Sequence, residues 1–320
     1  MMEGTVFLFP GQGAQFPGMA LDLLESGGQR IKSLFSLASD IAGYDMAAFL
    51  AKAGAEELKK TDVSQPLITL ANLAAAAYAS EKGIRPLSCA GFSLGEYAAL
   101  ACAGIISEEE CFFLVTRRGL AMQAAINRIA QNGSSPGMAA VIGLDPSKVE
   151  SLIAEWKSHG LLDLYAANIN SPKQVAVSGS AEALEEAEKC FKEAGAKRFL
   201  RLQVAGPFHS IFMREAAEAF APELEKVKFS DPVIPIFSNV TGKQIKNGTE
   251  AKALALRQIT ESVRWTDIEA AIAELEPKVL LETGPGKVLQ GLWKDTGSVI
   301  PCLSAGIAAQ IDELMKAEGV

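Results

Sequence analysis

The sequence predicts an α/β protein in which a large domain with a parallel sheet carries a smaller inserted domain. Strand-like and helical patterns alternate along most of the chain, which is typical of parallel strands covered by helices. A compact segment with a different order of elements interrupts this alternation. The third observation is a glycine-rich turn, GFSLG, between a strand-like and a helical stretch.

The composition is that of a globular protein. The chain has 320 residues, of which 49% are hydrophobic and 21% charged, enough for one large domain or two modest ones. Its net charge of −8 argues against a general nucleic-acid binder. We therefore expect no nucleic-acid partner.

The sequence shows no targeting or membrane segment. The N-terminus lacks the positive start of a signal peptide, and Pro10 and Gly11 break its first apolar stretch. The longest weakly polar run, residues 66–79, is shorter than a membrane span and contains Asn72. The five cysteines are odd in number and include no CxxC pair, which indicates reduced thiols. We expect a cytoplasmic protein with no membrane partner.

Residues 128–205 are predicted to form the small domain. The stretch NRIAQNGSSP marks its start. The elements that follow have the order βαββαβ of a ferredoxin-like unit: strand 138–144, a helix from Asp145 or Ser147 to Ser158, strands 161–168 and 174–178, helix 181–194 and strand 197–204. Residues 1–127 and 206–320 then form one discontinuous large domain, whose first strand is at 5–10.

The turn GFSLG places Ser93 between a strand at 86–90 and a helix at 96–103. Gly91 and Gly95 remove side chains that would crowd so sharp a turn. This pattern favours a nucleophile elbow, which exposes a serine hydroxyl for attack on an acyl group. The alternative is an ordinary turn residue. A nucleophilic serine needs a base close to it.

The sequence has only two histidines that could serve as this base. His159 ends a predicted helix, where a histidine favours the C-terminus, and we prefer that structural interpretation. His209 lies in GPFHS, on the loop that re-enters the large domain before a helix at 212–220, and is the candidate base. The third member of a triad stays open: Asp231, Glu282, or an amide or backbone carbonyl.

Two backbone amides are candidate donors to the oxyanion that forms on attack. Leu94 follows the serine at the start of a helix. Gln12 lies in the loop GQGAQ after the first strand, where glycines allow close approach to a ligand. The same loop fails as a dinucleotide fingerprint, because Phe16 replaces the third glycine of GxGxxG.

Arg118 is the residue that limits the range of possible substrates. A capping box, SEEE, opens a helix that runs to about residue 124. Arg118 falls on the apolar stripe of this helix, whereas Arg117 points away from it; the other members of the stripe are Cys111, Leu114, Val115 and Met122. A buried arginine needs an anionic partner. The pattern leaves open a structural salt bridge or a clamp on a substrate carboxylate.

Seven segments follow one another along the chain: GQGAQ, GFSLGEYAAL, TRRGLAMQ, ANINSPKQVAVSG, GPFHS, RQITESVRWT and ETGPGKVL. Together, in this order, they resemble the malonyl-CoA:acyl carrier protein transacylase family of type II fatty acid synthesis. The resemblance covers nearly the whole chain and extends to the acyltransferase domains of polyketide synthases. It implies an α/β-hydrolase-like large domain with a parallel sheet and an inserted ferredoxin-like small domain. It also implies malonyl-CoA and acyl carrier protein as partners, with no metal or organic cofactor.

The resemblance assigns roles to individual residues. Ser93 would become malonylated and His209 would be its base, oriented by the backbone or amide at Gln258 rather than by an acid. Arg118 would bind the malonyl carboxylate. The remaining implied site residues are Gln12 and Leu94 in the oxyanion hole, Gln65 in the pocket wall, and Asn168 and Asn170 near the site.

Phe208 departs from many stand-alone members of the family, which carry serine before the histidine. In related polyketide domains a phenylalanine here accompanies malonyl selectivity, so we expect a small unbranched acyl group. The sequence leaves open a polyketide partner, and a serine acyl hydrolase is a second alternative. Five basic residues of the small domain form a possible docking patch for an acidic carrier protein, or only a solvated face: Lys189, Lys192, Lys197, Arg198 and Arg201.

Overall fold

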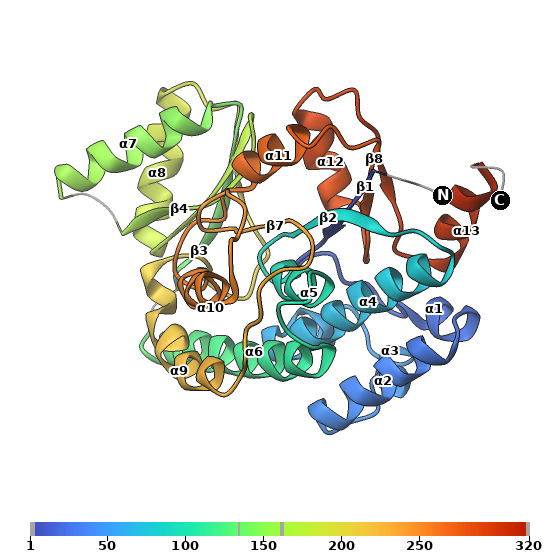
Figure 1. Cartoon of the computed structure of the whole chain (residues 1–320). Coiled ribbons are helices and arrows are strands. Elements are labelled where there is room, and N and C mark those ends of the chain that lie inside the picture. Colours follow the sequence, from blue (N-terminus) through green and yellow to red (C-terminus); the bar gives the residue numbers. More distant parts are fainter. Residues whose placement is uncertain (1–3, 134, 161–162, 318–320) are drawn as a thin grey trace.

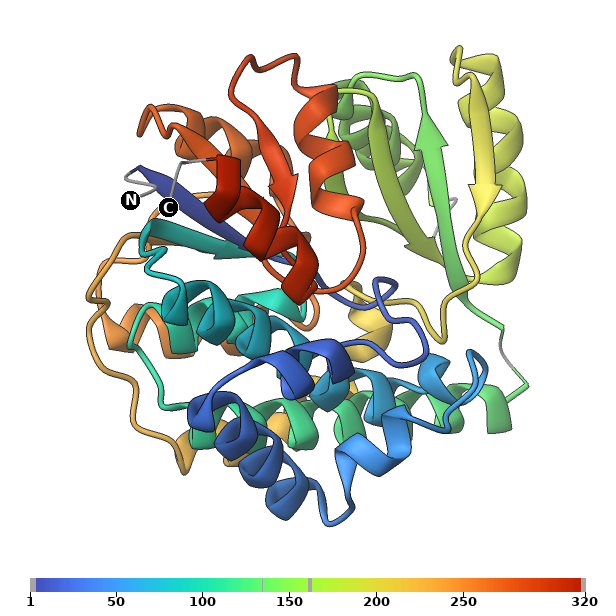
Figure 2. The same ribbon diagram turned by 90° about the vertical axis from the view of Figure 1, so that its right-hand side faces the viewer.

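Two separate sheets organise the fold, and helices lie against both of them (Figure 1). The structure is a computed structural model, and it describes residues 4–133, 135–160 and 163–317. The sheets lie side by side in both views (Figures 1 and 2). The mixed α/β architecture predicted from the sequence is confirmed.

The larger sheet has five parallel strands in the order β7-β2-β1-β8-β9. Their bounds are β1 Thr5–Phe9, β2 Pro86–Gly91, β7 Ile236–Phe237, β8 Val279–Glu282 and β9 Cys302–Ser304. The predicted strands at 5–10 and 86–90 are the central pair β1 and β2. The long connections between these strands carry the helices, as parallel pairing requires.

Apolar side chains on both faces of the parallel sheet are buried, which explains why its strands are mostly apolar. Along β1, Val6 and Leu8 point into one cluster of buried side chains, and Phe7 and Phe9 point into another. The Val6 face is covered by α11 and α12, whereas α4, α5 and α6 contribute to the cluster on the opposite face.

Thirteen α-helices lie within the described residues. In the large domain they are α1 Leu21–Ser26, α2 Gln29–Ala42, α3 Met46–Leu50, α4 Thr61–Glu81, α5 Gly95–Cys102, α6 Glu108–Gln131, α9 Arg214–Glu225, α10 Gly248–Arg257, α11 Trp265–Ala273, α12 Val288–Asp295 and α13 Ala308–Ala317. Short 3₁₀ turns occur at Glu57–Lys59 and Ile211–Met213. Within these residues, no helix is both long and apolar enough to cross a membrane.

The smaller sheet is antiparallel, with strand order β4-β5-β3-β6. Its elements follow the predicted βαββαβ order: β3 Gly137–Ile142, α7 Pro146–Ser158, β4 Leu164–Ser171, β5 Gln174–Gly179, α8 Ala181–Glu193 and β6 Arg198–Arg201. Residues 161–162 of the expected third element lie outside the described residues. This sheet and its two helices enclose their own apolar cluster, so the small unit has its own core.

Strand β4 joins the small sheet to the large domain. The backbone N–H of Ile169 donates to Val263 O at 2.8 Å, and Val263 N–H donates to Ala167 O at 2.9 Å. Asn168 and Asn170 therefore lie on the edge of the small sheet that meets the large domain.

Some element ends differ from the sequence-based expectation. Helix α6 continues to Gln131, beyond its predicted end near residue 124 and past the predicted division at residue 127. Its apolar face is packed as far as Ala125 and Ile126, which explains the extension beyond residue 124. Strand β6 ends at Arg201 rather than at residue 204, because residues 202–205 leave the sheet to line a cavity. Helix α9 begins at Arg214, after a 3₁₀ turn. The exact division between the domains stays a prediction.

Candidate active site

The turn between β2 and α5 holds Ser93 in a left-handed backbone conformation, with φ of +50°. Strand β2 ends at Gly91, and α5 begins at Gly95. A Cβ atom on Gly91 would lie 2.0 Å from the backbone of Gly95, and one on Gly95 would lie 2.0 Å from Phe9 O. Only glycine fits at either position, because the facing atoms are backbone. The predicted reason for both glycines is confirmed.

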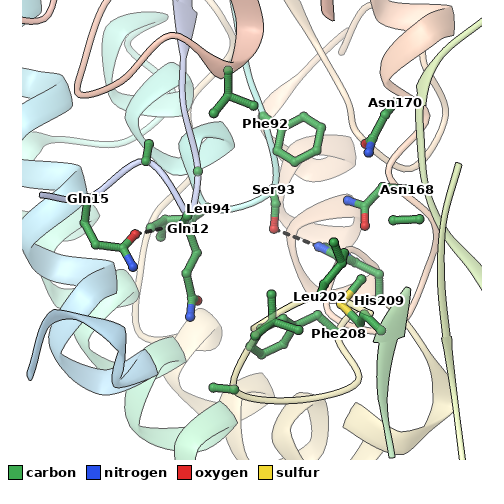
Figure 3. Close-up of a pocket in the computed structure, with 18 of the residues that line it drawn as sticks. Gln12, Gln15, Phe92, Ser93, Leu94, Asn168, Asn170, Leu202, Phe208 and His209 are labelled. Carbon is green, nitrogen blue, oxygen red and sulfur yellow. Dashed lines mark hydrogen bonds between the residues drawn. The ribbon is translucent and has the colours of Figure 1, made fainter. Parts of the chain in front are cut away.

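His209 faces Ser93 across the site (Figure 3). The distance between Ser93 Oγ and His209 Nε2 is 2.7 Å, and His209 Nδ1 lies 2.8 Å from the carbonyl oxygen of Gln258. A carbonyl only accepts, so Nδ1 carries the proton and Nε2 accepts from the serine hydroxyl. The imidazole is thus held in the tautomer that can remove a proton from Ser93.

The environment keeps this histidine neutral. Burial, followed by the nearby positive charge of Arg118, lowers the pKa of His209 to about 4, although the bond to the Gln258 carbonyl acts in the opposite direction. A neutral imidazole at physiological pH is free to accept a proton.

Neither acidic candidate for the third triad position touches His209. The carboxylate of Glu282 accepts from the backbone amides of Leu289 and Gln290 at 3.1 and 2.8 Å. Asp231 Oδ1 accepts from Gly248 N–H at 3.0 Å. Both carboxylates stabilise the start of a helix, and the carbonyl of Gln258 occupies the orienting position. His159, the other histidine, follows the last residue of α7 in the small domain, as expected.

Gln12 and Leu94 line the same cavity as Ser93. The loop that carries Gln12 approaches the elbow closely, since a Cβ atom on Gly11 would lie 2.4 Å from Phe92 O. Within the described part of the chain, the backbone N–H groups of Gln12 and Leu94 have no hydrogen-bond acceptor. Two free amides beside a serine suit a developing oxyanion.

Arg118 is buried in helix α6, with 1% of its surface exposed, and it lines the cavity. One guanidinium nitrogen donates to Gln258 Oε1 at 3.1 Å, and the guanidinium carbon lies 5.5 Å from the ring centre of Tyr97. Its Nε is buried without a partner, and no carboxylate of the described residues lies within ion-pair distance. Burial lowers the pKa of Arg118. The prediction that Arg118 lies on the buried face of its helix is confirmed, and Arg117 is exposed as expected.

The cavity has a volume of about 490 Å³ and opens between the two sheets. Asn168 and Asn170 form one side of it, and Phe208 lies beside His209 (Figure 3). The other predicted site residue, Gln65, is not among the described residues that line this cavity. It lies behind Met122, with its Nε2 3.3 Å from the methionine sulfur.

Two polar side chains of the site were missed by sequence reasoning. Glu96 and Asn239 are buried behind the elbow and bond to each other, with Asn239 N–H donating to Glu96 Oε1 at 3.1 Å. Glu96 directly follows the GFSLG turn in a helix of small, apolar residues. A single carboxylate in such a helix was the sequence feature that could have marked it as a site residue. Nothing local to Asn239 singled it out.

No group of three or more histidine, cysteine, aspartate or glutamate side chains among the described residues is placed to hold a metal ion. The polar groups that converge on the cavity include a serine, a neutral histidine, a cationic arginine and free backbone amides. Such a set can form, stabilise and release an ester on the serine hydroxyl.

This fold and this site define a class: acyltransferases that carry the acyl group on a serine. The sequence profile described as "Acyl transferase domain" matches residues 6–313. A Haemophilus influenzae protein named malonyl CoA-acyl carrier protein transacylase is 39% identical over 295 residues, which is 92% of each chain. The chain belongs to the malonyl-CoA:acyl carrier protein transacylase family.

Solved structures are similar over almost the whole chain. The acyl carrier protein S-malonyltransferase of Vibrio cholerae is 34% identical, with a TM-score of 0.90, and the match covers 98% of this chain and 100% of that one. A malonyl-transacylase solved in complex with its type II polyketide acyl carrier protein is 35% identical, with a TM-score of 0.89 and coverage of 98% and 99%. The α/β architecture with a separate antiparallel sheet is thus shared with these acyltransferases.

Proposed function

We propose that this protein transfers a malonyl group from malonyl-CoA, through an ester on Ser93, to the phosphopantetheine thiol of acyl carrier protein for fatty acid biosynthesis. The observation that carries the proposal is the 2.7 Å contact between Ser93 Oγ and His209 Nε2 in a cavity that is also lined by the buried Arg118.

The first half-reaction loads the serine. His209 Nε2 takes the hydroxyl proton as Ser93 Oγ attacks the thioester carbon of malonyl-CoA. The resulting oxyanion accepts from the backbone amides of Gln12 and Leu94, each worth about 100- to 1,000-fold in rate in comparable enzymes. The tetrahedral intermediate collapses, His209 returns the proton to the departing CoA sulfur, and malonyl-Ser93 remains.

The second half-reaction repeats these steps with the carrier thiol. His209 takes the thiol proton, the thiolate attacks the ester carbon, and the serine oxygen leaves with the returned proton. Throughout, the guanidinium of Arg118 holds the malonyl carboxylate. The Nε of Arg118 has no partner within the protein and is free to donate to this carboxylate. The cycle requires no metal or organic cofactor, and we expect it to run in the cytoplasm.

The site favours a small dicarboxylic half-thioester. Arg118 is buried without a bonded carboxylate, so a substrate carboxylate would neutralise it, whereas a neutral ester would leave it unpaired. This argues against a serine hydrolase of neutral esters. Phe208 is buried beside His209 in the cavity wall and restricts room for a branched acyl group.

The relative bound to a polyketide carrier shows that the same scaffold serves that pathway, but the full-length relatives named for malonyl transfer to acyl carrier protein favour the general enzyme. The docking surface on the small domain stays a proposal. Lys189 and Lys192 there already pair with Glu186 and Glu188, which reduces their value as docking charges.

Intact-protein mass spectrometry after exposure to malonyl-CoA tests the function. We expect one malonyl adduct on the wild type and none on Ser93→Ala, and holo acyl carrier protein should remove the adduct by accepting it. A wild type that gains no adduct, or an adduct that survives Ser93→Ala, refutes the proposal. Adduct loss to water at the same rate with and without carrier would indicate a hydrolase.

A further inference from the structure

The carboxylate of Glu96 lies behind the nucleophile and takes no part in the cycle described above. It is 3% exposed, in the first turn of α5. One oxygen accepts from Asn239 N–H at 3.1 Å, and the other accepts a short hydrogen bond from Gln258 Nε2. Burying a carboxylate costs free energy unless it is hydrogen-bonded in this way.

Asn239, the first partner of Glu96, forms side-chain hydrogen bonds to the backbone of the turn that carries Ser93. Asn239 Oδ1 accepts from Ser93 N–H at 2.6 Å, and Nδ2 donates to Gly91 O at 2.7 Å. A serine in the left-handed region is strained, and such strain persists only where surrounding bonds hold it. By bonding the backbone of Asn239, Glu96 helps to place the amide that holds this turn.

Gln258, the second partner of Glu96, bonds to Ser93, His209 and Arg118. Its carbonyl accepts from His209 Nδ1, its Nε2 donates to Ser93 O at 2.8 Å as well as to Glu96, and its Oε1 accepts from Arg118 at 3.1 Å. An ionised carboxylate can only accept, so Glu96 requires the NH₂ group of Gln258 to face it. The amide oxygen is then left to face Arg118.

We propose that Glu96 is a positioning residue for malonyl transfer: as a carboxylate, it orients Gln258 and Asn239, and through them it holds Ser93 and Arg118 in their working arrangement. This inference rests on the function proposed above. Glu96 touches neither the substrate nor the reacting atoms, so it acts only through the two amides.

The charges around Glu96 give the proposal a measurable pH signature. Burial raises the pKa of Glu96 to about 7, although its bonds to Gln258 and Asn239 and the charge of Arg118 oppose the rise. The titratable groups that face it are Arg118 on α6 and Tyr97 on α5, while the loop after β7 and the end of α10 present uncharged amides. A protonated carboxyl keeps only one good acceptor oxygen and loses one of its two partners.

The experiment measures the rate of malonyl-Ser93 formation from malonyl-CoA between pH 5 and pH 9, using the full chain. Loading is the better half-reaction, because its nucleophile is the serine and not an added thiol. The variant is Glu96→Gln. The matched control is Glu269→Gln, which removes another buried carboxylate, 2% exposed and bonded to Trp265 Nε1 at 2.9 Å, on α11.

For the wild type we expect loading to slow as the pH falls through about 7, well above the titration of His209 near 4. In Glu96→Gln the inflection near 7 should disappear, and the rate at pH 8 should fall by about 100-fold, the usual effect of a small misplacement of reacting groups. The concentration of malonyl-CoA that half-saturates loading should rise by a smaller factor, since Arg118 keeps its charge but loses part of its orientation by Gln258. Glu269→Gln should keep the wild-type rate and pH profile.

A folded Glu96→Gln variant with the wild-type rate and the wild-type inflection overturns the positioning role. If that variant does not fold, the wild-type profile decides: an inflection near pH 7 supports the role, and its absence overturns it. A wild type that forms no malonyl ester at any pH contradicts the proposed function instead, so the two failures are distinguishable.

Discussion

Replacement of Arg118 by alanine should convert a malonyl-selective site into one that no longer distinguishes malonyl from acetyl groups. The guanidinium is 1% exposed and bonds to Gln258 Oε1, and its Nε has no partner. A bound malonyl carboxylate would therefore complete its hydrogen bonding. An acetyl group has no carboxylate to offer and gains nothing from the positive charge.

The size of the effect follows from burial. Truncating one member of a buried, hydrogen-bonded charge pair costs about 2–5 kcal/mol, and each 1.4 kcal/mol is tenfold. We therefore expect malonyl loading of Arg118→Ala to fall by about 30- to 4,000-fold, while acetyl loading survives or rises.

The assay compares initial rates of acyl-serine formation from malonyl-CoA and acetyl-CoA by mass spectrometry. Arg117→Ala is the matched control, because its side chain is exposed and lies 3.8 Å from Glu223. It should load both substrates at wild-type rates. If Arg118→Ala folds and loses malonyl and acetyl loading equally, the arginine supports the fold or the base, and the carboxylate clamp is wrong.

Two further outcomes test the elbow and the base. Gly95→Ala should destabilise the protein by at least about 1–3 kcal/mol in urea unfolding, because the added Cβ would lie 2.0 Å from Phe9 O. The control is Gly291→Ala in α12, where an added Cβ would have no atom within 4 Å, and it should be neutral or slightly stabilising. For His209 the folded pKa of about 4 lies below its usual 6.5, so the unfolded chain binds more protons between these values and the wild type loses stability as the pH falls through that window. His209→Asn removes this loss. The difference in unfolding free energy, variant minus wild type, should therefore increase as the pH falls from 6.5 to 4. A difference that stays constant would show that the histidine is not buried in its neutral form.

Local patterns were sufficient to predict the two central strands of the large sheet, the elements of the small domain, three helices of the large domain and several site residues. The capping box of Ser107 and Glu110 opens α6 as expected, with both of its hydrogen bonds present. The apolar periodicity of that helix put Arg118 on the buried face, because side chains at helical spacing share a direction. The GFSLG turn predicted the elbow, because only glycine tolerates the backbone contacts at its two ends.

Contacts between distant segments were beyond such reasoning. Ser93 and His209 are 116 positions apart, and Ser93 and Gln258 are 165 apart, so no local pattern fixes the distance between them. Residue patterns alone left the orienting group of His209 open among two acids, an amide and a carbonyl, and only the family resemblance implied the backbone or amide at Gln258. The tertiary structure decided for the carbonyl of Gln258, because each acid is engaged at the start of another helix.

The sequence by itself thus determined the central strands, the order of elements in the small domain, where the elbow lies and which arginine is buried. These features depend on periodicity and backbone freedom over a few residues. Only the folded structure decided that Glu96 and Asn239 stand behind Ser93, and that Gln65 lies behind Met122 rather than on the cavity wall. The physical reason is that hydrogen bonds between segments depend on how all the elements pack together, and a linear pattern does not record that packing.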